Sequence, residues 1–285
     1  MSTPADFPAS TPLAGGTTAT DGTVVPLLPA QRRQHIVDFL RRHGAVTLQQ
    51  LEQALGVSVS TLRRDLDGLA AEGVIDRTHG GALLRQQEYS TFEPDAGAAA
   101  ELSPLEKEAI GRLAADALLP RQSVIFDSGS TVLEAARAAL RRNIPLIAVT
   151  NDLTIAQLLG GSAQIQVHLL GGVLRPGSPT VTGQSLVEQA RTICADVLLM
   201  GAHAVTDGVL SETSAEVAAT KRALMAAATT RRLLVDASKF RPRAFMQVAT
   251  LGELHEVITD DGIGAADEER LRALSLQVTI ARCRR

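Results

Sequence analysis

The sequence has few of the residues on which several classes of protein depend. Its 285 residues include two cysteines, Cys194 and Cys283, too few for a disulfide framework or a metal cluster built from cysteine. Apolar runs are interrupted well short of the ~20 residues that span a bilayer, and residues 1–6 lack the basic start of a signal peptide. These absences exclude a secreted disulfide scaffold, a membrane protein and a zinc finger, and they predict a cytoplasmic protein without a bound metal or cofactor.

Aromatic residues and lysine are also scarce. Aromatics make up 2% of the sequence, so a ligand pocket built from stacked rings is not expected. The chain has three lysines (Lys107, Lys221 and Lys239), so arginine supplies the other 25 of its 28 basic residues. Because lysine carries a compact ammonium that arginine does not reproduce, we expect the retained lysines to have specific roles. The net charge of −3 means that a nucleic-acid partner would have to be held by a local basic surface.

Composition and periodicity change along the chain. Residues 1–29 are rich in Thr, Ala, Pro and Gly without periodicity and predict a disordered tail. Residues 30–86 form a block of short helical patterns, and residues 87–102 predict a linker. From 103 to 285, apolar strands alternate with helices, which predicts an α/β domain with a largely parallel sheet.

The block at 30–86 has the pattern of a winged helix-turn-helix. Apolar spacing predicts helices at about 30–43, after Thr47 and after Ser58, with Thr47 and Ser58 as N-caps. Residues 74–84 predict a β-hairpin, or wing. The helix after Ser58 is the one expected to enter a major groove, and its first turns carry side chains that suit base edges and phosphates: Ser60, Thr61, Arg63 and Arg64. The alternative is a solvated face in which Arg63 and Arg64 pair with Asp65 or Asp67.

A longer motif favours DNA binding over that alternative. The string Val57-Ser58-Val59-Ser60-Thr61-Leu62-Arg63-Arg64-Asp65-Leu66, followed by Gly73 and by Arg77-Thr78-His79-Gly80-Gly81-Ala82, resembles the N-terminal signature of the DeoR family of bacterial repressors. The resemblance implies that the helix from Ser58 reads operator bases. It also implies that Arg77, His79 and Gly80 belong to a wing near the DNA backbone.

The C-terminal part has identifiable strands and helices. Strands are expected at 124–126, 146–149, 165–170, 197–200 and 233–235, with helices at 153–159, 186–192 and 216–230. Ser103-Pro104-Leu105-Glu106 predicts a capping box that opens a helix. Cys194 is expected to be a small core residue.

Polar and glycine clusters follow the expected strands, at the edge of a parallel sheet where ligands collect. Ser128, Gly129, Ser130 and Thr131 lie at a helix N-terminus and suit an anion, while Asp127 suits sugar hydroxyls. The other candidates are Thr150, Asn151, Gly171, Gly172, Lys221, Asp236 and Lys239, with Lys239 placed to neutralise a phosphate. Each cluster taken singly is ordinary turn or capping chemistry, but their shared position at strand ends predicts a pocket.

These clusters also carry a resemblance. Asp127-Ser128-Gly129-Ser130-Thr131, Thr150-Asn151, Gly171-Gly172 and Leu234-Val235-Asp236-Ala237-Ser238-Lys239-Phe240 are similar to the DeoR sensor domain. That resemblance implies a fold like ribose-5-phosphate isomerase and a phosphorylated sugar or related metabolite as effector. Met200-Gly201-Ala202-His203-Ala204 departs from the family pattern, and His203 is a candidate for altered ligand choice.

Three functions remain open at this point. The leading hypothesis is a DNA-binding regulator, a repressor of a carbohydrate operon, which binds double-stranded operator DNA as a dimer or tetramer and responds to a phosphorylated sugar. The second is a sugar-phosphate isomerase with a DNA-binding appendage, in which Asp127, Glu216 and Lys221 supply acid–base groups. The third is a DNA-binding protein that responds to no ligand.

Overall fold

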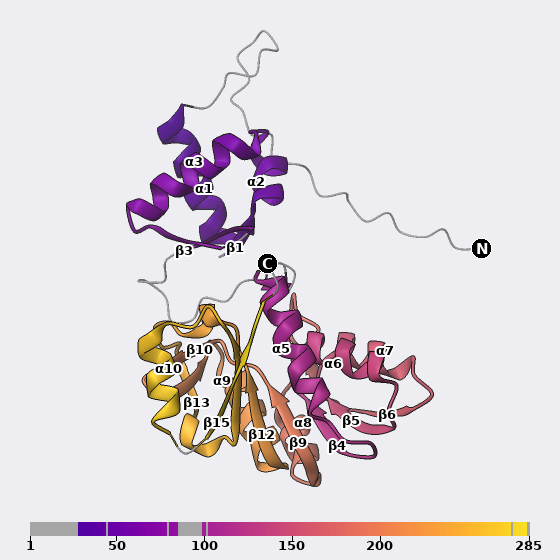
Figure 1. The fold of residues 1–285 in the computed structure, drawn as a ribbon. Coiled ribbons are helices and arrows are strands. Elements are labelled where there is room, and N and C mark those ends of the chain that lie inside the picture. The colour runs from indigo at the N-terminus through magenta and orange to yellow at the C-terminus, as the bar shows by residue number, and fades with distance from the viewer. Residues whose placement is uncertain are drawn as a thin grey trace, which may run out of the picture. The chain divides into compact units, whose positions relative to one another are not determined.

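The chain folds as two compact units, Met1–Arg85 and Gln86–Arg285 (Figure 1). The computed structural model describes residues 28–43, 45–78, 80–84, 99–100, 102–274 and 276–283. The expected tail at 1–29 and linker at 87–102 therefore fall mostly outside the described residues. In the described ranges, every helix is too short or too polar to cross a bilayer.

The N-terminal unit has three helices and a small antiparallel sheet in its described residues. They are α1 (Pro29–His43), β1 (Ala45–Thr47), α2 (Leu48–Leu55), α3 (Val59–Ala71), β2 (Ile75–Arg77) and β3 (Gly81–Leu84). The sheet order is β1-β3-β2, so β2 and β3 form the expected wing hairpin. Strand β1 was not expected, because three residues are too few to show a periodic pattern.

The helices of this unit pack through the apolar faces that the sequence predicts. The side chains buried at their centre are Ile36, Leu40, Leu51, Leu62, Leu66 and Leu69. Thr47 caps α2 in a reciprocal capping box with Gln50, as expected for an N-cap threonine. Gly56 ends the helix with φ of +62°, a left-handed conformation that glycine adopts without strain. The turn between α2 and α3 is thus fixed by local chemistry.

Gly81 is required where β3 pairs with β1. A Cβ atom at residue 81 would lie 1.8 Å from the Val46 carbonyl oxygen, whereas a Cβ at Gly80 would meet nothing within 4 Å. We expect Gly81→Ala to lower the free energy of unfolding by about 1–3 kcal/mol, the usual cost of overpacking a closed site. Urea unfolding of the full chain followed by circular dichroism measures this loss. Gly80→Ala is the matched control, and an equal loss in both variants would contradict the explanation.

The C-terminal unit is built on a parallel sheet of order β15-β14-β12-β9-β4-β5-β6. Its strands are β4 (Ser123–Phe126), β5 (Leu146–Thr150), β6 (Ile165–Leu169), β9 (Ala195–Met200), β12 (Ala228–Leu234), β14 (Glu256–Asp260) and β15 (Gln277–Ala281). Smaller strands are β7 (Val173–Leu174), β8 (Val181–Thr182), β10 (Ala204–Thr206), β11 (Val209–Glu212) and β13 (Met246–Thr250). The expected α/β class is confirmed.

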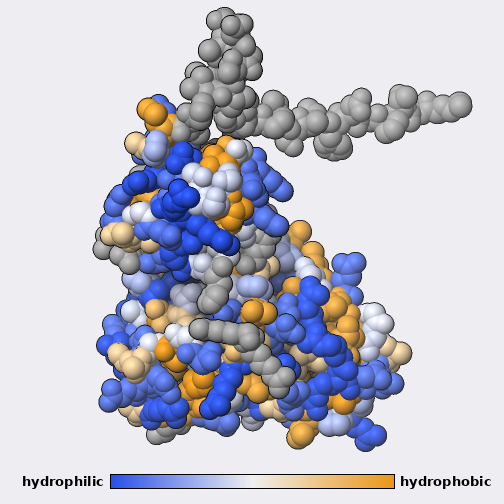
Figure 2. Space-filling model, turned by 45° about the horizontal axis from the view of Figure 1, so that its top comes forward, coloured by the Kyte–Doolittle hydropathy of each residue, from blue (hydrophilic) through white to orange (hydrophobic). Residues whose placement is uncertain are grey.

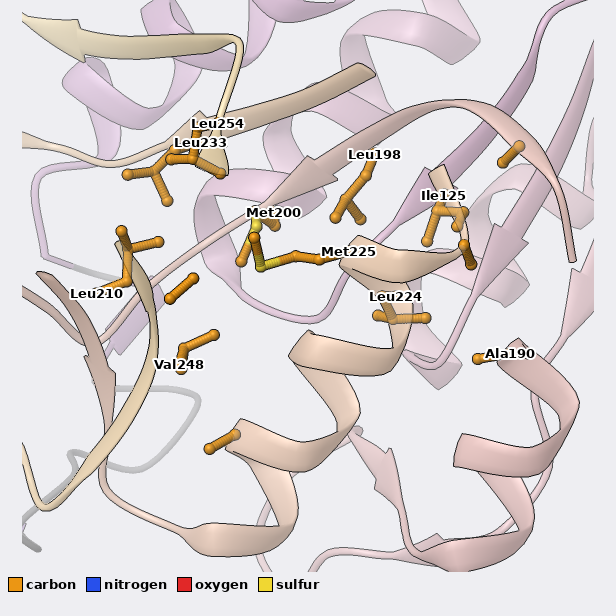
Figure 3. Close-up of a cluster of buried hydrophobic side chains, with 14 of the residues drawn as sticks. Ile125, Ala190, Leu198, Met200, Leu210, Leu224, Met225, Leu233, Val248 and Leu254 are labelled. Carbon is orange, nitrogen blue, oxygen red and sulfur yellow. The ribbon is translucent and has the colours of Figure 1, made fainter. Parts of the chain in front are cut away.

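Helices cover both faces of the parallel sheet. They are α5 (Pro104–Asp116), α6 (Ser130–Arg142), α7 (Leu153–Gly160), α8 (Gln184–Ala190), α9 (Ala215–Ala226) and α10 (Ala265–Arg272). Alternation along β4 sends Val124 and Phe126 into the core under α5, α6 and α7, while Ile125 enters the core under α8 and α9. In that second core, Met225 reaches from α9 toward Met200 on β9 (Figure 3). Packing of α9 in this way fixes the helix that carries Lys221.

Three local expectations were wrong. Ser103 precedes α5 but makes no capping hydrogen bond, because its φ of +49° turns the chain into a left-handed conformation there. Cys194 is exposed and does not belong to the core. The helix expected at 216–230 ends at Ala226, and residues from Ala228 onward pair with β9 and β14 as β12. In the last case a central strand position overrides helix propensity.

Candidate functional site

Helix α3 presents two arginines that have no acidic partner among the described residues. Arg63 and Arg64 are exposed. The two acidic residues of α3 bond arginines of other elements. Asp65 is 4% exposed and bonded to Arg32 of α1, with 3.2 Å between Arg32 Nη2 and Asp65 Oδ1. Asp67 Oδ1 lies 3.1 Å from Arg77 Nε of the wing. The alternative in which Arg63 and Arg64 pair with these acids is therefore wrong.

The start of α3 carries a cluster of hydroxyl groups. Ser58 Oγ lies 3.2 Å from Ser60 Oγ and 3.1 Å from Thr61 Oγ1. Ser58 occupies the N-cap position but forms no side-chain cap, so its expected capping bond is absent. The uncapped amide groups and these exposed hydroxyls suit a phosphate of a nucleic-acid backbone. On the face drawn in Figure 2, hydrophilic side chains cover most of this unit.

The wing residues hold the unit together. Arg77 bonds Asp67 and also donates from Nη1 to the Gly81 carbonyl oxygen at 3.4 Å, so its guanidinium braces the wing against α3. The Gly80 carbonyl oxygen accepts from the Leu48 amide at 2.9 Å and ties the wing turn to the start of α2. His79 lies outside the described residues. Arg77 and Gly80 therefore position the helix-turn-helix in addition to any contact with DNA.

The expected ligand residues meet at the carboxyl edge of the parallel sheet. Strand β4 pairs with β5 on one side and β9 on the other, and the chain continues away from β4 in both directions. The loops after β4 and β9 thus lie at the topological switch point, where open α/β sheets bind ligands. Asp127 begins the first loop, and Gly201 begins the second.

A buried ion pair lies between these two loops. Lys221 Nζ of α9 donates to Asp127 Oδ2 and, at 3.0 Å, to the Gly201 carbonyl oxygen, and it lies 3.5 Å from Glu212 Oε1. Burial alone would lower the pKa of Lys221, but the Asp127 and Glu212 carboxylates more than offset it and raise that pKa. Asp127 is 1% exposed, and its Oδ1 has no hydrogen-bond partner among the described residues. This carboxylate oxygen has the chemistry to accept one further hydrogen bond.

The loop from Ser128 to Thr131 opens α6. Gly129 precedes the helix with φ of +126°, a conformation that disfavours side-chain residues, and no side chain caps the first turn. The Ser130 hydroxyl reaches the Ala99 carbonyl oxygen at 3.5 Å. Asp152, after β5, accepts hydrogen bonds from the Thr154 and Ile155 amides, and burial nevertheless raises its pKa. The Gly129 amide of the loop also bonds Asp152, so the amides left without a side-chain cap are those of the first turn of α6.

Four other predicted site residues make main-chain or packing contacts at the same edge: Thr150, Asn151, Gly171 and Gly172. Asn151 Nδ2 donates to the Val181 carbonyl oxygen at 3.0 Å, and the Val181 amide donates back to the Asn151 carbonyl oxygen at 2.7 Å. Thr150 Oγ1 accepts from the Asp152 amide, and Gly171 bonds Gln189. A Cβ at Gly172 would lie 2.4 Å from the Thr182 carbonyl oxygen. Together these contacts fasten the β7–β8 hairpin to the edge of the sheet.

The same hairpin carries Arg175, which was not among the residues predicted from the sequence. Its charge acts on Glu216 of α9 and on His203 after β9, so it belongs to the same neighbourhood. His203 is buried, and Arg241 Nη2 lies 2.9 Å from its Nε2. Burial and the Arg241 charge lower the pKa of His203 to about 2, so the ring is neutral. Because arginine can only donate, Nε2 accepts and the ring proton is on Nδ1.

All three lysines of the chain are buried or half-buried and act on this region. Asp236 Oδ1 accepts from the Ser238 amide at 3.0 Å at the start of the turn that carries Lys239. Burial and the Arg241 charge lower the pKa of Lys239 to about 8. Lys107 of α5, which the site prediction did not include, is 2% exposed, and its charge helps to lower the pKa of Asp236 against the effect of burial. The scarcity of lysine was the signal that could have found it.

Comparison with known proteins matches both units. A family model for the DeoR C-terminal sensor domain matches residues 103–261, more than half of the chain, and one for a DeoR-like helix-turn-helix domain matches residues 32–88. The putative aga operon transcriptional repressor of Escherichia coli O157:H7 is 28% identical, over 88% of this chain and 93% of its own.

Further relatives have similar coverage. The transcriptional repressor GlcR of Bacillus subtilis (strain 168) is 31% identical over 81% of this chain and 88% of its own. The glycerol-3-phosphate regulon repressor of Escherichia coli (strain K12) is 31% identical over 81% and 90%. Among solved structures, ribose 5-phosphate isomerase A from Neisseria gonorrhoeae is 16% identical with a TM-score of 0.36, over 48% of this chain and 53% of that chain.

Proposed function

The chain belongs to the DeoR family of transcriptional regulators, and we propose that it represses a carbohydrate operon by binding double-stranded operator DNA through α3. The observation that carries the DNA contact is the pair Arg63 and Arg64, exposed on α3 while Asp65 and Asp67 are bonded to other elements. Arginine in this position grips guanine edges or phosphates. DNA binding places the protein in the cytoplasm, and two-fold related half-sites require a homo-oligomer, a dimer or tetramer.

The effector in this proposal is a phosphorylated sugar or related metabolite bound at the carboxyl edge of the sheet. Asp127 Oδ1 would accept a sugar hydroxyl. The phosphate would occupy the uncapped start of α6 at Ser128–Thr131 and contact Lys239. The isomerase alternative is not favoured, because the relatives are named as regulators. In addition, Lys221 and Asp127 form an ion pair with each other, which opposes their use as acid–base groups.

Fluorescence anisotropy with labelled DNA from upstream of the gene tests this function. The full-length chain is titrated at fixed salt, because phosphate contacts make affinity strongly salt-dependent. Titrations are made alone and with glycerol 3-phosphate, hexose 6-phosphates or inorganic phosphate. Tight binding that one sugar phosphate changes by about 5–150-fold is the expected result. Binding no tighter than to random DNA would contradict the repressor, and a response to none of the sugar phosphates would contradict the sensor.

Lys239 gives this site a pH dependence. Its pKa of about 8 means that it is charged at pH 7 and loses its proton as pH rises through 8. We therefore expect effector affinity, measured by isothermal titration calorimetry, to fall by about tenfold between pH 7 and pH 9. Lys239→Arg keeps its charge and should bind with little change over that range. Equal pH dependence in the two proteins would show that Lys239 does not contact the phosphate.

A further inference from the structure

The main-chain carbonyl of Ala99 receives two side-chain donors from different helices. Lys107 Nζ of α5 donates to the carbonyl oxygens of Ala99 and Leu102, each at 2.5 Å. Ser130 Oγ, the first residue of α6, reaches the same Ala99 oxygen at 3.5 Å. We call these three contacts the Ala99 latch. They hold the stretch of chain that comes directly before the sensor.

Burying Lys107 has a free-energy cost that its contacts must offset. The side chain is 2% exposed, and among the described residues its hydrogen bonds are to main-chain oxygens. Burial accordingly lowers its pKa. The buried ammonium of Lys107 bonds two carbonyl groups and so fixes the path of the chain at Ala99 and Leu102. These bonds resist rearrangement because leaving a buried carbonyl or ammonium without a partner costs free energy.

Ser130 belongs to the latch and to the proposed effector loop. Its hydroxyl has one proton, so it can donate to Ala99 or to a bound phosphate but not to both. Helices α5 and α6 have no room to move closer and restore the contact: a Cβ at Gly111 of α5 would lie 2.5 Å from the Ala135 amide nitrogen of α6. A change at Ser130 is therefore passed to Ala99.

We propose that the Ala99 latch couples effector binding to the chain that leads to the DNA-binding unit, with Lys107 as the positioning residue. The inference rests on the proposed function, because the effector phosphate must take the Ser130 hydroxyl. When it does, Ala99 keeps the bond from Lys107 alone, and the chain before the sensor is held less firmly. Lys107 touches no effector in this scheme: its ammonium bonds main-chain oxygens, and its charge acts on Asp236 of the effector edge without a hydrogen bond to the ligand.

Lys107→Met separates coupling from binding. It keeps the length of the side chain and removes the ammonium, and Arg112→Ala, an exposed change on the same helix, is the matched control. Calorimetry with glycerol 3-phosphate, hexose 6-phosphates and inorganic phosphate measures anion affinity, and anisotropy measures operator affinity with and without each. We expect Lys107→Met still to bind the active probe, with an affinity shifted by the loss of a charge that acts on Asp236, so operator affinity is compared at saturating probe. The effect of that probe on operator affinity should fall from about 5–150-fold to below twofold.

Two outcomes overturn the latch. If Lys107→Met responds to the probe as fully as Arg112→Ala, Lys107 has no part in coupling, while the proposed sensor stands. If the unmodified chain responds to none of the probes, the proposed function fails and the latch fails with it. Should Lys107→Met not fold, hydrogen exchange in the unmodified chain replaces it: faster exchange at the amides of 102–107 on adding the active probe supports the latch, and unchanged exchange contradicts it.

Discussion

Replacing Arg63 and Arg64 with alanine is expected to abolish most specific DNA binding. Each arginine that touches a base edge or phosphate contributes about 1–3 kcal/mol, so the double variant should bind operator DNA about 30-fold to about 20,000-fold more weakly. The physical reason is that neither guanidinium has an acidic partner on α3, since Asp65 and Asp67 are bonded to Arg32 and Arg77. Anisotropy at fixed salt against upstream DNA measures the change.

Two comparisons decide what such a loss would mean. Arg191→Ala removes an exposed arginine from the sensor unit and should leave operator affinity within about twofold. The single variants distinguish the contacts: a phosphate arginine weakens binding to all sequences and reduces the salt dependence, whereas a base-reading arginine relaxes preference at one base pair. Operator affinity that is unchanged in the double variant would remove α3 as the recognition helix.

Much of the N-terminal unit could be predicted because its signals are local. Thr47 caps α2, Gly56 turns the chain with a positive φ, and the buried leucines follow helical spacing. The partners of Asp65 and Asp67 could not be predicted, because Arg32 and Arg77 come from α1 and the wing. The sequence suggested the neighbouring Arg63 and Arg64 as partners of these acids, whereas the fold brings Arg32 and Arg77 to them from distant segments.

The effector edge was predictable in position and less so in chemistry. Residues that follow parallel strands share one edge of the sheet, so Asp127 and Asn151 were expected near each other. Their hydrogen bonds depend on segments distant in the sequence: Lys221 of α9 donates to Asp127, and Asn151 donates to the Val181 carbonyl oxygen of the hairpin. Arg175 was missed because no periodic pattern marks a two-residue strand such as β7.

Lys221→Met should be the most destabilising of these substitutions. Removing one partner of a buried ion pair leaves the other uncompensated and costs about 3–5 kcal/mol. Here two carboxylates, Asp127 and Glu212, and the Gly201 carbonyl would lose the Lys221 ammonium together. Urea unfolding of the full chain followed by circular dichroism should show the transition of the C-terminal unit at markedly lower urea. Arg191→Ala, an exposed change in the same unit, should move that transition little.

Adding Asp127→Asn to Lys221→Met identifies the source of the loss. If the unpaired charge of Asp127 is the main cost, the double variant should be more stable than Lys221→Met, although Glu212 remains buried and charged. A double variant no more stable than Lys221→Met would show that the unpaired charge of Asp127 is not the main cost. Lys221 joins the loops after β4 and β9. The stability of the fold and the shape of the proposed effector site therefore both depend on the bond between Lys221 and Asp127. Substitutions meant to alter ligand choice alone therefore belong at His203, whose ring bonds Arg241 and not that pair.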